Sequence, residues 1–224
     1  MEKYKILNLY ACLGGNRYKW DEVSNNIEVT AVELDNELAR MYKERFPNDI
    51  VIVADAHQYL LEHYKEFDFI WSSPPCPSHS RARYWSSSNY ETTTDAIYPD
   101  MKLYEEILFL QHYFKTGKFV VENVIPYYEP LITSKKRGRH LYWTNFNLPT
   151  DLNDRRVQIG ARKNELNKLC EFHKIDISSY KGEQSLIKIA RNLVDYEAGK
   201  TILEIALNIF KSNNINQKSI FDEM

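Results

Sequence analysis

The sequence predicts one α/β domain with a mostly parallel sheet and helices on both faces. Three observations lead to this fold class. Five short apolar segments are interspersed with helical patterns and loops, as in sheets whose strands are joined by crossover helices. The chain has 224 residues, enough for one domain with a core and a small appendage. Hydrophobic residues make up 43% of it and charged residues 27%, a balance typical of globular proteins.

The elements can be placed in order along the chain. Strands are expected at residues 5–11 and 27–35, followed by a helix at 36–47 that stops at Pro47. Further strands are expected at 49–55, 67–73 and 118–124, with an amphipathic helix at 101–115 before the last one. Residues 78–99 are too long for an ordinary connection and suggest a functional lid. Strand-like pieces follow at 140–146, one or two helices at 183–211, and a polar tail after that.

Ligands of open parallel sheets bind beyond the carboxyl ends of the strands. This rule predicts one functional rim of strand-end residues, which contains Tyr10, Glu33, Asp55, residues 73–76 and residues 122–124.

Composition limits the class of protein. A net charge of −2 argues weakly against nucleic-acid binding, but basic residues cluster at 81–83, 135–139 and 155–163, which is compatible with DNA. The sequence has no apolar run of membrane-spanning length and no secretion signal, so no membrane association is expected. The three cysteines have no paired spacing, which favours a reducing compartment without disulfides and without a metal site.

Two rim residues suggest covalent chemistry. Cys76 follows Pro74-Pro75, whose rigid backbone would present its thiol from a stiff turn, although a free cysteine is as often a small buried hydrophobe. Glu122 supplies a carboxylate at the end of the fifth strand, where a surface charge is the alternative.

Other rim residues suggest a nucleotide. Gly14-Gly15 would let a cofactor approach the backbone of the first turn. Glu33 would accept hydrogen bonds from ribose hydroxyls, and Asp55 one from an adenine amino group. Taken alone, either acid is more often a helix cap or a surface charge.

Several motifs, taken in order, resemble those of the DNA cytosine-carbon-5 methyltransferase family. Residues 8–15 (NLYACLGG) resemble its first cofactor motif, D-L-F-x-G-x-G-G, and Glu33 and Asp55 match the acids after its second and third strands. Residues 74–80 (PPCPSHS) are similar to the nucleophile motif P-P-C-x-x-x-S, and Glu122-Asn123-Val124 is the E-N-V motif, about 46 residues after Cys76. Residues 137–139 resemble the end of Q-x-R-x-R, and residues 191–194 (RNLV) resemble G-N-x-V.

The resemblance covers nearly the whole chain and suits a short bacterial or phage member. It implies a Rossmann-like, S-adenosylmethionine-dependent methyltransferase fold with a very small recognition region. The catalytic domain would be residues 1–146 and 183–211, with recognition by 147–182 and a polar tail at 212–224. Asn8, Cys12, Lys135 and Arg191 depart from the family's Asp, Gly, Gln and Gly.

The resemblance also implies roles for individual residues. Cys76 would attack carbon 6 of a flipped-out cytosine, Glu122 would hold ring nitrogen 3, and Arg139 would contact the carbonyl oxygen or a phosphate. Asn123 would order the Pro-Pro-Cys turn, while Ser80, Arg81 and Arg83 would lie on a loop closing over DNA, unless that loop is merely solvated. Arg137 would also contact the substrate. The residues implied to bind S-adenosylmethionine or S-adenosylhomocysteine are Tyr10, Ala11, Gly14, Gly15, Glu33, Leu34, Asp55, Ala56, Pro74, Asn192 and Val194.

The expected function is therefore methylation of carbon 5 of cytosine in double-stranded DNA, in a restriction-modification or phage-protection setting. A monomer in the cytoplasm of a bacterial or phage-infected cell is expected, with a partner subunit left open. One alternative is a tRNA cytosine methyltransferase on the same scaffold. Another is a nucleic-acid-binding or cofactor-binding protein with a decayed site, which the altered first motif favours. An oxidoreductase ranks lower, because G-x-G-x-x-G is absent.

Overall fold

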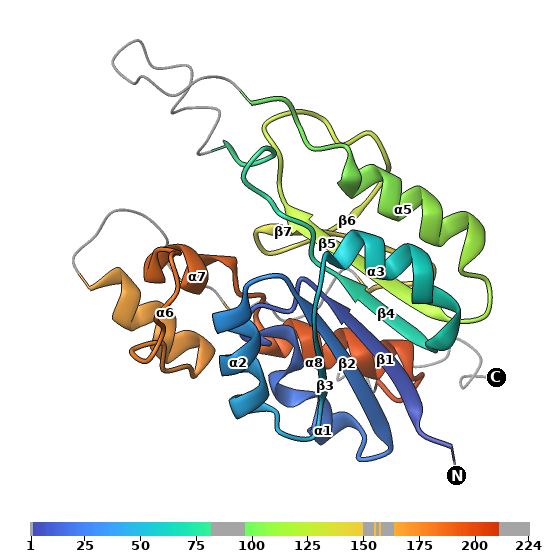
Figure 1. The fold of residues 1–224 in the computed structure, drawn as a ribbon. Coiled ribbons are helices and arrows are strands. Elements are labelled where there is room, and N and C mark those ends of the chain that lie inside the picture. Colours follow the sequence, from blue (N-terminus) through green and yellow to red (C-terminus); the bar gives the residue numbers. More distant parts are fainter. Residues whose placement is uncertain (1, 82–96, 150–154, 156, 158–163, 211–224) are drawn as a thin grey trace, which may run out of the picture.

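The structure is a computed structural model that describes residues 2–81, 97–149, 155, 157 and 164–210 (Figure 1). Within this part of the chain a seven-stranded sheet has the order β3-β2-β1-β4-β5-β7-β6. The first five strands of the chain pair in parallel, and β7 and β6 add an antiparallel edge. The strands are β1 (Tyr4–Leu9), β2 (Ile27–Glu33), β3 (Ile50–Val53), β4 (Phe69–Ser72), β5 (Lys118–Val124), β6 (Lys135–Arg137) and β7 (His140–Thr144).

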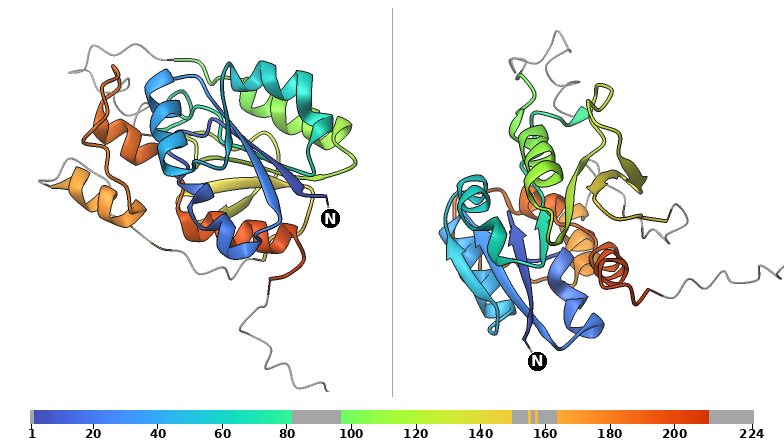
Figure 2. Two further views of the ribbon diagram at one scale, coloured as in Figure 1. Left: turned by 60° about the horizontal axis from the view of Figure 1, so that its bottom comes forward. Right: turned by 90° about the vertical axis from the view of Figure 1, so that its right-hand side faces the viewer.

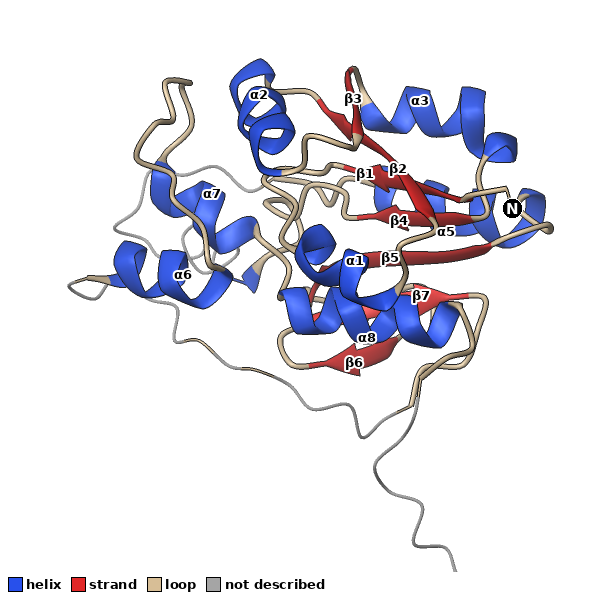
Figure 3. Ribbon diagram, turned by 90° about the horizontal axis from the view of Figure 1, so that it is seen from below, coloured by secondary structure: helices blue, strands red, loops and turns tan. Residues whose placement is uncertain are grey.

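Helices cover both faces of the sheet (Figures 2 and 3). One face carries α3 (Ala56–His63) and α5 (Lys102–Tyr113), and the other carries α1 (Trp20–Val23), α2 (Asn36–Arg45) and α8 (Tyr196–Ala206). Successive side chains of a strand point to opposite faces, so Leu7 packs toward α3 and α5 while Ile6 packs toward Trp20 and α8. The sheet is therefore buried on both sides, as parallel sheets are.

A third apolar cluster lies beside the sheet. It joins α2 to α6 (Glu165–His173) and α7 (Leu186–Asn192) through buried residues such as Leu38, Leu169 and Ile189. Figure 1 shows α6 and α7 next to α2, outside the sheet.

The predicted fold class is confirmed. All five expected strands are present, β5 with the expected bounds and the other four with ends that differ by one or two residues, and the helices expected at 36–47 and 101–115 are α2 and α5. The segment 183–211 contains two helices, α7 and α8, and the second begins where the Asp195 side chain accepts the Glu197 backbone N–H. The described residues contain no helix that is long and apolar enough to span a membrane.

Some elements were not expected from the sequence. They are η1 (Asn16–Lys19), α1, α3, η2 (Tyr64–Glu66), α6 and β6. The start of α3 had a usable signal, because Asp55 accepts the Gln58 backbone N–H at 2.9 Å as a helix cap.

Candidate active site

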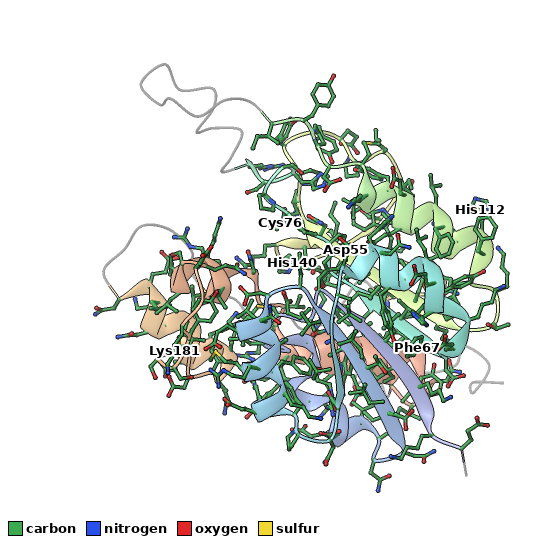
Figure 4. All side chains as sticks on the ribbon, in the orientation of Figure 1. Asp55, Phe67, Cys76, His112, His140 and Lys181 are labelled. Atoms are coloured by element: carbon green, nitrogen blue, oxygen red, sulfur yellow. The ribbon has the colours of Figure 1, made fainter. Side chains whose placement is uncertain are left out.

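The carboxyl ends of the parallel strands surround a cavity of about 420 Å³. Figure 4 shows Asp55, Cys76 and His140 gathered at this end of the sheet. The cavity has one group of lining residues from the ends of β1, β2 and β3, and another from β4 and β5. Side chains from α7 complete the wall.

Most of the residues expected to bind a cofactor line this cavity. Those that line it are Tyr10, Glu33, Leu34, Asp55, Ala56, Pro74 and Asn192. Four others are buried against protein instead and do not line it, namely Ala11, Gly14, Gly15 and Val194.

The two glycines have a structural reason that the sequence did not suggest. A Cβ at Gly15 would lie 2.5 Å from the backbone oxygen of Val194. Gly14 has a φ of +66°, and a Cβ there would meet the ring of Phe46 at 2.4 Å. The absence of a side chain at both glycines therefore lets neighbouring parts of the chain pack closely on this turn, namely the end of α2 and the residues after α7.

The acids at the strand ends organise backbone as well as lining the cavity. Glu33 accepts the Cys12 backbone N–H at 2.8 Å and the Asp35 backbone N–H at 3.0 Å. Burial raises the pKa of Glu33 above its ordinary value. Asp55 both caps α3 and faces the cavity, so the cap and the binding interpretations are compatible.

The turn that presents Cys76 is held by named hydrogen bonds. The Asn123 side-chain N–H donates to the backbone oxygen of Pro74 at 2.9 Å, and the backbone N–H groups of His79 and Ser80 donate to that of Cys76 at 3.0 and 3.1 Å. Burial and the charge of Glu122 raise the pKa of the Cys76 thiol to about 11, while Arg139 and Lys188 act in the opposite direction.

Glu122 is buried beside Cys76, with 5% of its surface exposed. Burial raises the pKa of Glu122 to about 7, and a Ser73 hydrogen bond and the charge of Arg139 limit that rise. Nε2 of His140 lies 3.5 Å from Glu122 Oε1. Burial and the charge of Arg139 lower the pKa of His140 to about 3, so this imidazole is neutral and the contact is not an ion pair.

Arg139 lies between this site and a second cavity. Its guanidinium donates to the backbone oxygen of Arg191 at 2.9 Å, and burial lowers its pKa although Glu122 and Cys76 oppose the change. The second cavity has a volume of about 610 Å³, and its cationic lining residues are Lys136, Arg137, Arg139 and Arg155. Arg155 pairs with Asp195 at 3.0 Å.

Comparison with known proteins shows the family of the chain. A family model described as C-5 cytosine-specific DNA methylase matches residues 4–137, more than half of the chain. The chain belongs to this family. The matched region includes Cys76 and Glu122 but ends before Arg139. No curated protein matches the chain.

Solved structures resemble the methylase chain mainly in fold. Entamoeba histolytica methyltransferase EhMeth has 11% identity and a TM-score of 0.53, with 95% of this chain and 100% of that chain covered. A Spodoptera frugiperda DNMT2 mutant has 25% identity and a TM-score of 0.40, with 55% of this chain and 36% of that chain covered. A putative DNA modification methyltransferase from an Escherichia coli prophage has 17% identity and a TM-score of 0.38, with 57% of this chain and 34% of that chain covered. The chain thus spans about a third of the last two proteins.

The residues that depart from the family motifs have local explanations. Cys12 takes a φ of +47° where the family has glycine, a strained conformation that costs about 1 kcal/mol or more. Its backbone N–H still reaches Glu33, so the turn keeps this anchor. Asn8 accepts a hydrogen bond from the Asn16 side chain at 2.8 Å. Arg191 forms a bidentate ion pair with Glu165 at 2.8 and 2.9 Å, which ties α7 to α6.

The other predicted substrate residues have different positions relative to the two cavities. Asn123 lines the first cavity, and Arg137 lines the second with 8% of its surface exposed. Ser80 and Arg81 line neither; Ser80 bridges to Pro126, whose oxygen accepts from Arg81 Nε at 3.2 Å. Arg83 lies outside the described residues.

Sequence reasoning missed Lys188 and His140 as residues of the site, and it placed Ser73 on the rim without a role at Glu122. Lys188 lines the cavity from α7 and favours the Cys76 thiolate. Ser73 and His140 act on or next to Glu122. The sequence signal for Ser73 was its position next to the Pro-Pro-Cys motif, and that for His140 was its position next to Arg139. Lys188 had no such signal, because it comes from a helix distant in sequence.

Proposed function

We propose that the protein transfers a methyl group from S-adenosylmethionine to carbon 5 of a flipped-out cytosine in DNA, through a covalent adduct with Cys76. The observation that carries this proposal is a single cavity shared by the Cys76 and Glu122 pair and by the strand-end residues expected to bind the cofactor. A methyl donor and a cytosine ring would meet there without rearrangement of the sheet.

The first half of the cavity fits the cofactor. Leu34, Leu38 and Ile189 offer apolar contacts, while the carboxylates of Glu33 and Asp55 face the same space and can accept hydrogen bonds from a nucleoside. When bound, S-adenosylmethionine supplies an electrophilic methyl group on its sulfonium.

The catalytic half can activate the ring and the thiol together. In the free protein the high pKa of Cys76 keeps its thiol protonated, and the charge of Glu122 contributes to this. When Glu122 carries a proton toward ring nitrogen 3, that contribution is lost, and Arg139 and Lys188 favour the thiolate. The Cys76 thiol would give its proton to solvent as its sulfur adds to carbon 6. The electron pair at carbon 5 can then take the methyl group, and S-adenosylhomocysteine would leave with the electron pair of the broken carbon–sulfur bond. Loss of the carbon-5 proton to solvent and departure of the sulfur restore the aromatic ring.

Nucleic acid would approach from the side of the second cavity. Its four cationic side chains suit a phosphodiester backbone, with Arg139 reaching the target base and Arg137 a nearby phosphate. Residues 147–182, which include α6, would form the short recognition region, and Ser80, Arg81 and Arg83 would belong to the loop that closes over the flipped nucleotide.

The test is transfer of tritiated methyl groups to duplex DNA and, in parallel, to tRNA. We expect label in DNA with the natural chain and none with Cys76→Ala, since that variant keeps the fold but lacks the nucleophile. Label in tRNA alone would favour the tRNA alternative. Equal transfer by Cys76→Ala would exclude the covalent mechanism, and failure to bind S-adenosylmethionine would favour a decayed site.

A further inference from the structure

Glu106 in α5 is a carboxyl group buried near the cofactor half of the cavity but not lining it. Its side chain has no exposed surface. It accepts hydrogen bonds from the Tyr10 hydroxyl at 2.6 Å and the Ser72 hydroxyl at 2.5 Å, and Nδ1 of His57 lies 3.1 Å away. These four side chains come from four separate segments of the chain.

Each partner of Glu106 adjoins a segment that lines the cavity. Tyr10 lines it directly, at a φ of +56° in the turn after β1. Ser72 ends β4 immediately before Ser73 and Pro74, which are lining residues. His57 follows Asp55 and Ala56 at the start of α3. One carboxylate therefore joins three of the segments on which a nucleoside would rest.

Stability alone is a poor reason to keep this arrangement. A buried carboxylate carries a large desolvation cost, and apolar side chains of similar volume are often as stabilising. The cost is offset here by three partners, including His57, whose pKa the hydrogen bond to Glu106 raises. Tyr10 stands where the family motif resembled by residues 8–15 has phenylalanine, so the hydroxyl that meets Glu106 is a feature of this chain.

We propose that Glu106 is a positioning residue for the cofactor, because its bonds to Tyr10, Ser72 and His57 fix the cavity wall in the binding geometry. The inference rests on the proposed function and adds a residue that does not itself touch the ligand. Tyr10 is the direct link, since it lines the cavity in a strained backbone conformation while its hydroxyl is bonded to Glu106.

The test is calorimetric binding of S-adenosylmethionine and S-adenosylhomocysteine to the full chain and its variants. Loss of a charged hydrogen bond predicts about tenfold weaker binding in Glu106→Gln and a smaller loss in Tyr10→Phe. The double variant should bind no more weakly than Glu106→Gln, because both changes break one link. At saturating cofactor, the kcat of Glu106→Gln should stay within about threefold of that of the natural chain, because the substitution weakens binding of the cofactor equally in the ground state and in the transition state.

Glu62→Gln is the matched control. Its carboxylate lies on α3, as His57 does, but is 55% exposed. This variant should bind like the natural chain. Should Glu106→Gln fail to fold, Tyr10→Phe still decides, because it removes one oxygen and keeps the ring.

Two results overturn the inference in distinguishable ways. One result is that the natural chain binds the cofactor and that both variants, Tyr10→Phe and Glu106→Gln, bind it as tightly as the natural chain does. Glu106 then has no positioning role, and the proposed function stands. Independent, additive losses would also overturn the link through Tyr10. If the natural chain binds neither compound, the proposed function falls and takes this inference with it.

Discussion

At the residue scale, Cys76, Glu122 and Arg139 control one another's protonation. Burial raises the pKa of both the thiol and the carboxyl, and the negative charge of Glu122 raises the pKa of Cys76 further. Arg139 counters both effects. In the proposed mechanism, a proton on Glu122 would be available to ring nitrogen 3 and would also ease formation of the Cys76 thiolate, which would couple the two steps of base activation.

This state of Glu122 predicts a pH dependence of stability. Its pKa is about 7 in the folded chain against an ordinary value of 4.5, so over this interval the folded state keeps a proton that the unfolded chain has lost. The free energy of unfolding contributed by Glu122 is therefore full below about pH 4.5 and falls as the pH rises to about 7.

Urea denaturation at several pH values, in the natural chain and in Glu122→Gln, measures that contribution. Taking the difference between the two removes the opposite contributions of His140 and His173, whose pKa values burial lowers to about 3. We expect the natural chain to lose stability relative to the variant between pH 5 and 7. Parallel profiles would mean that Glu122 is not buried as described.

At the element scale, the β6–β7 hairpin brings cations to the site. Lys136, Arg137 and Arg139 belong to it and line the second cavity, together with Arg155. The hairpin lies at the antiparallel edge of the sheet, beyond the catalytic strand β5. In the proposed mechanism its turn would therefore contact a nucleic-acid backbone while Glu122 holds the base.

Lys135 and Lys136 allow a matched test of that role. Both are exposed lysines of β6, but only Lys136 lines the cavity. Lys136→Gln should weaken duplex binding and lower the slope of log K against log salt by about 0.9, whereas Lys135→Gln should leave both nearly unchanged. Fluorescence anisotropy at a series of salt concentrations measures this. Equal effects of the two substitutions would show that the second cavity is not part of the surface that binds nucleic acid.

The elements also show what local pattern can and cannot predict. The five parallel strands β1 to β5 were predictable because apolar or alternating segments are followed by turn residues or acids, and the carboxyl ends of parallel strands share one rim. α6 and β6 were not predictable, because their sequences are polar and short and depend on tertiary contacts such as the Arg191 and Glu165 pair. Lys188 was not predictable as a site residue because the tertiary packing of α7 brings it to the cavity.

At the scale of the whole molecule, one cavity at the end of one sheet is lined both by strand-end residues expected to bind the cofactor and by Cys76, the proposed nucleophile. Net charge is −2, yet four cationic side chains line one cavity beside the catalytic pair. In the proposed assignment the recognition region is the short segment between β7 and α7, whose helix α6 packs on α2 and α7. We therefore expect few base contacts and a short target sequence.

The most direct measurement is adduct formation with duplex DNA that carries 5-fluorocytosine at mixed sites, in the presence of tritiated S-adenosylmethionine. Fluorine at carbon 5 blocks the final elimination, so the sulfur of Cys76 stays bonded to the base. The account predicts a labelled protein–DNA adduct that resists denaturation and is absent with Cys76→Ala. An adduct that persists in Cys76→Ala, or label in DNA without any adduct, would contradict it.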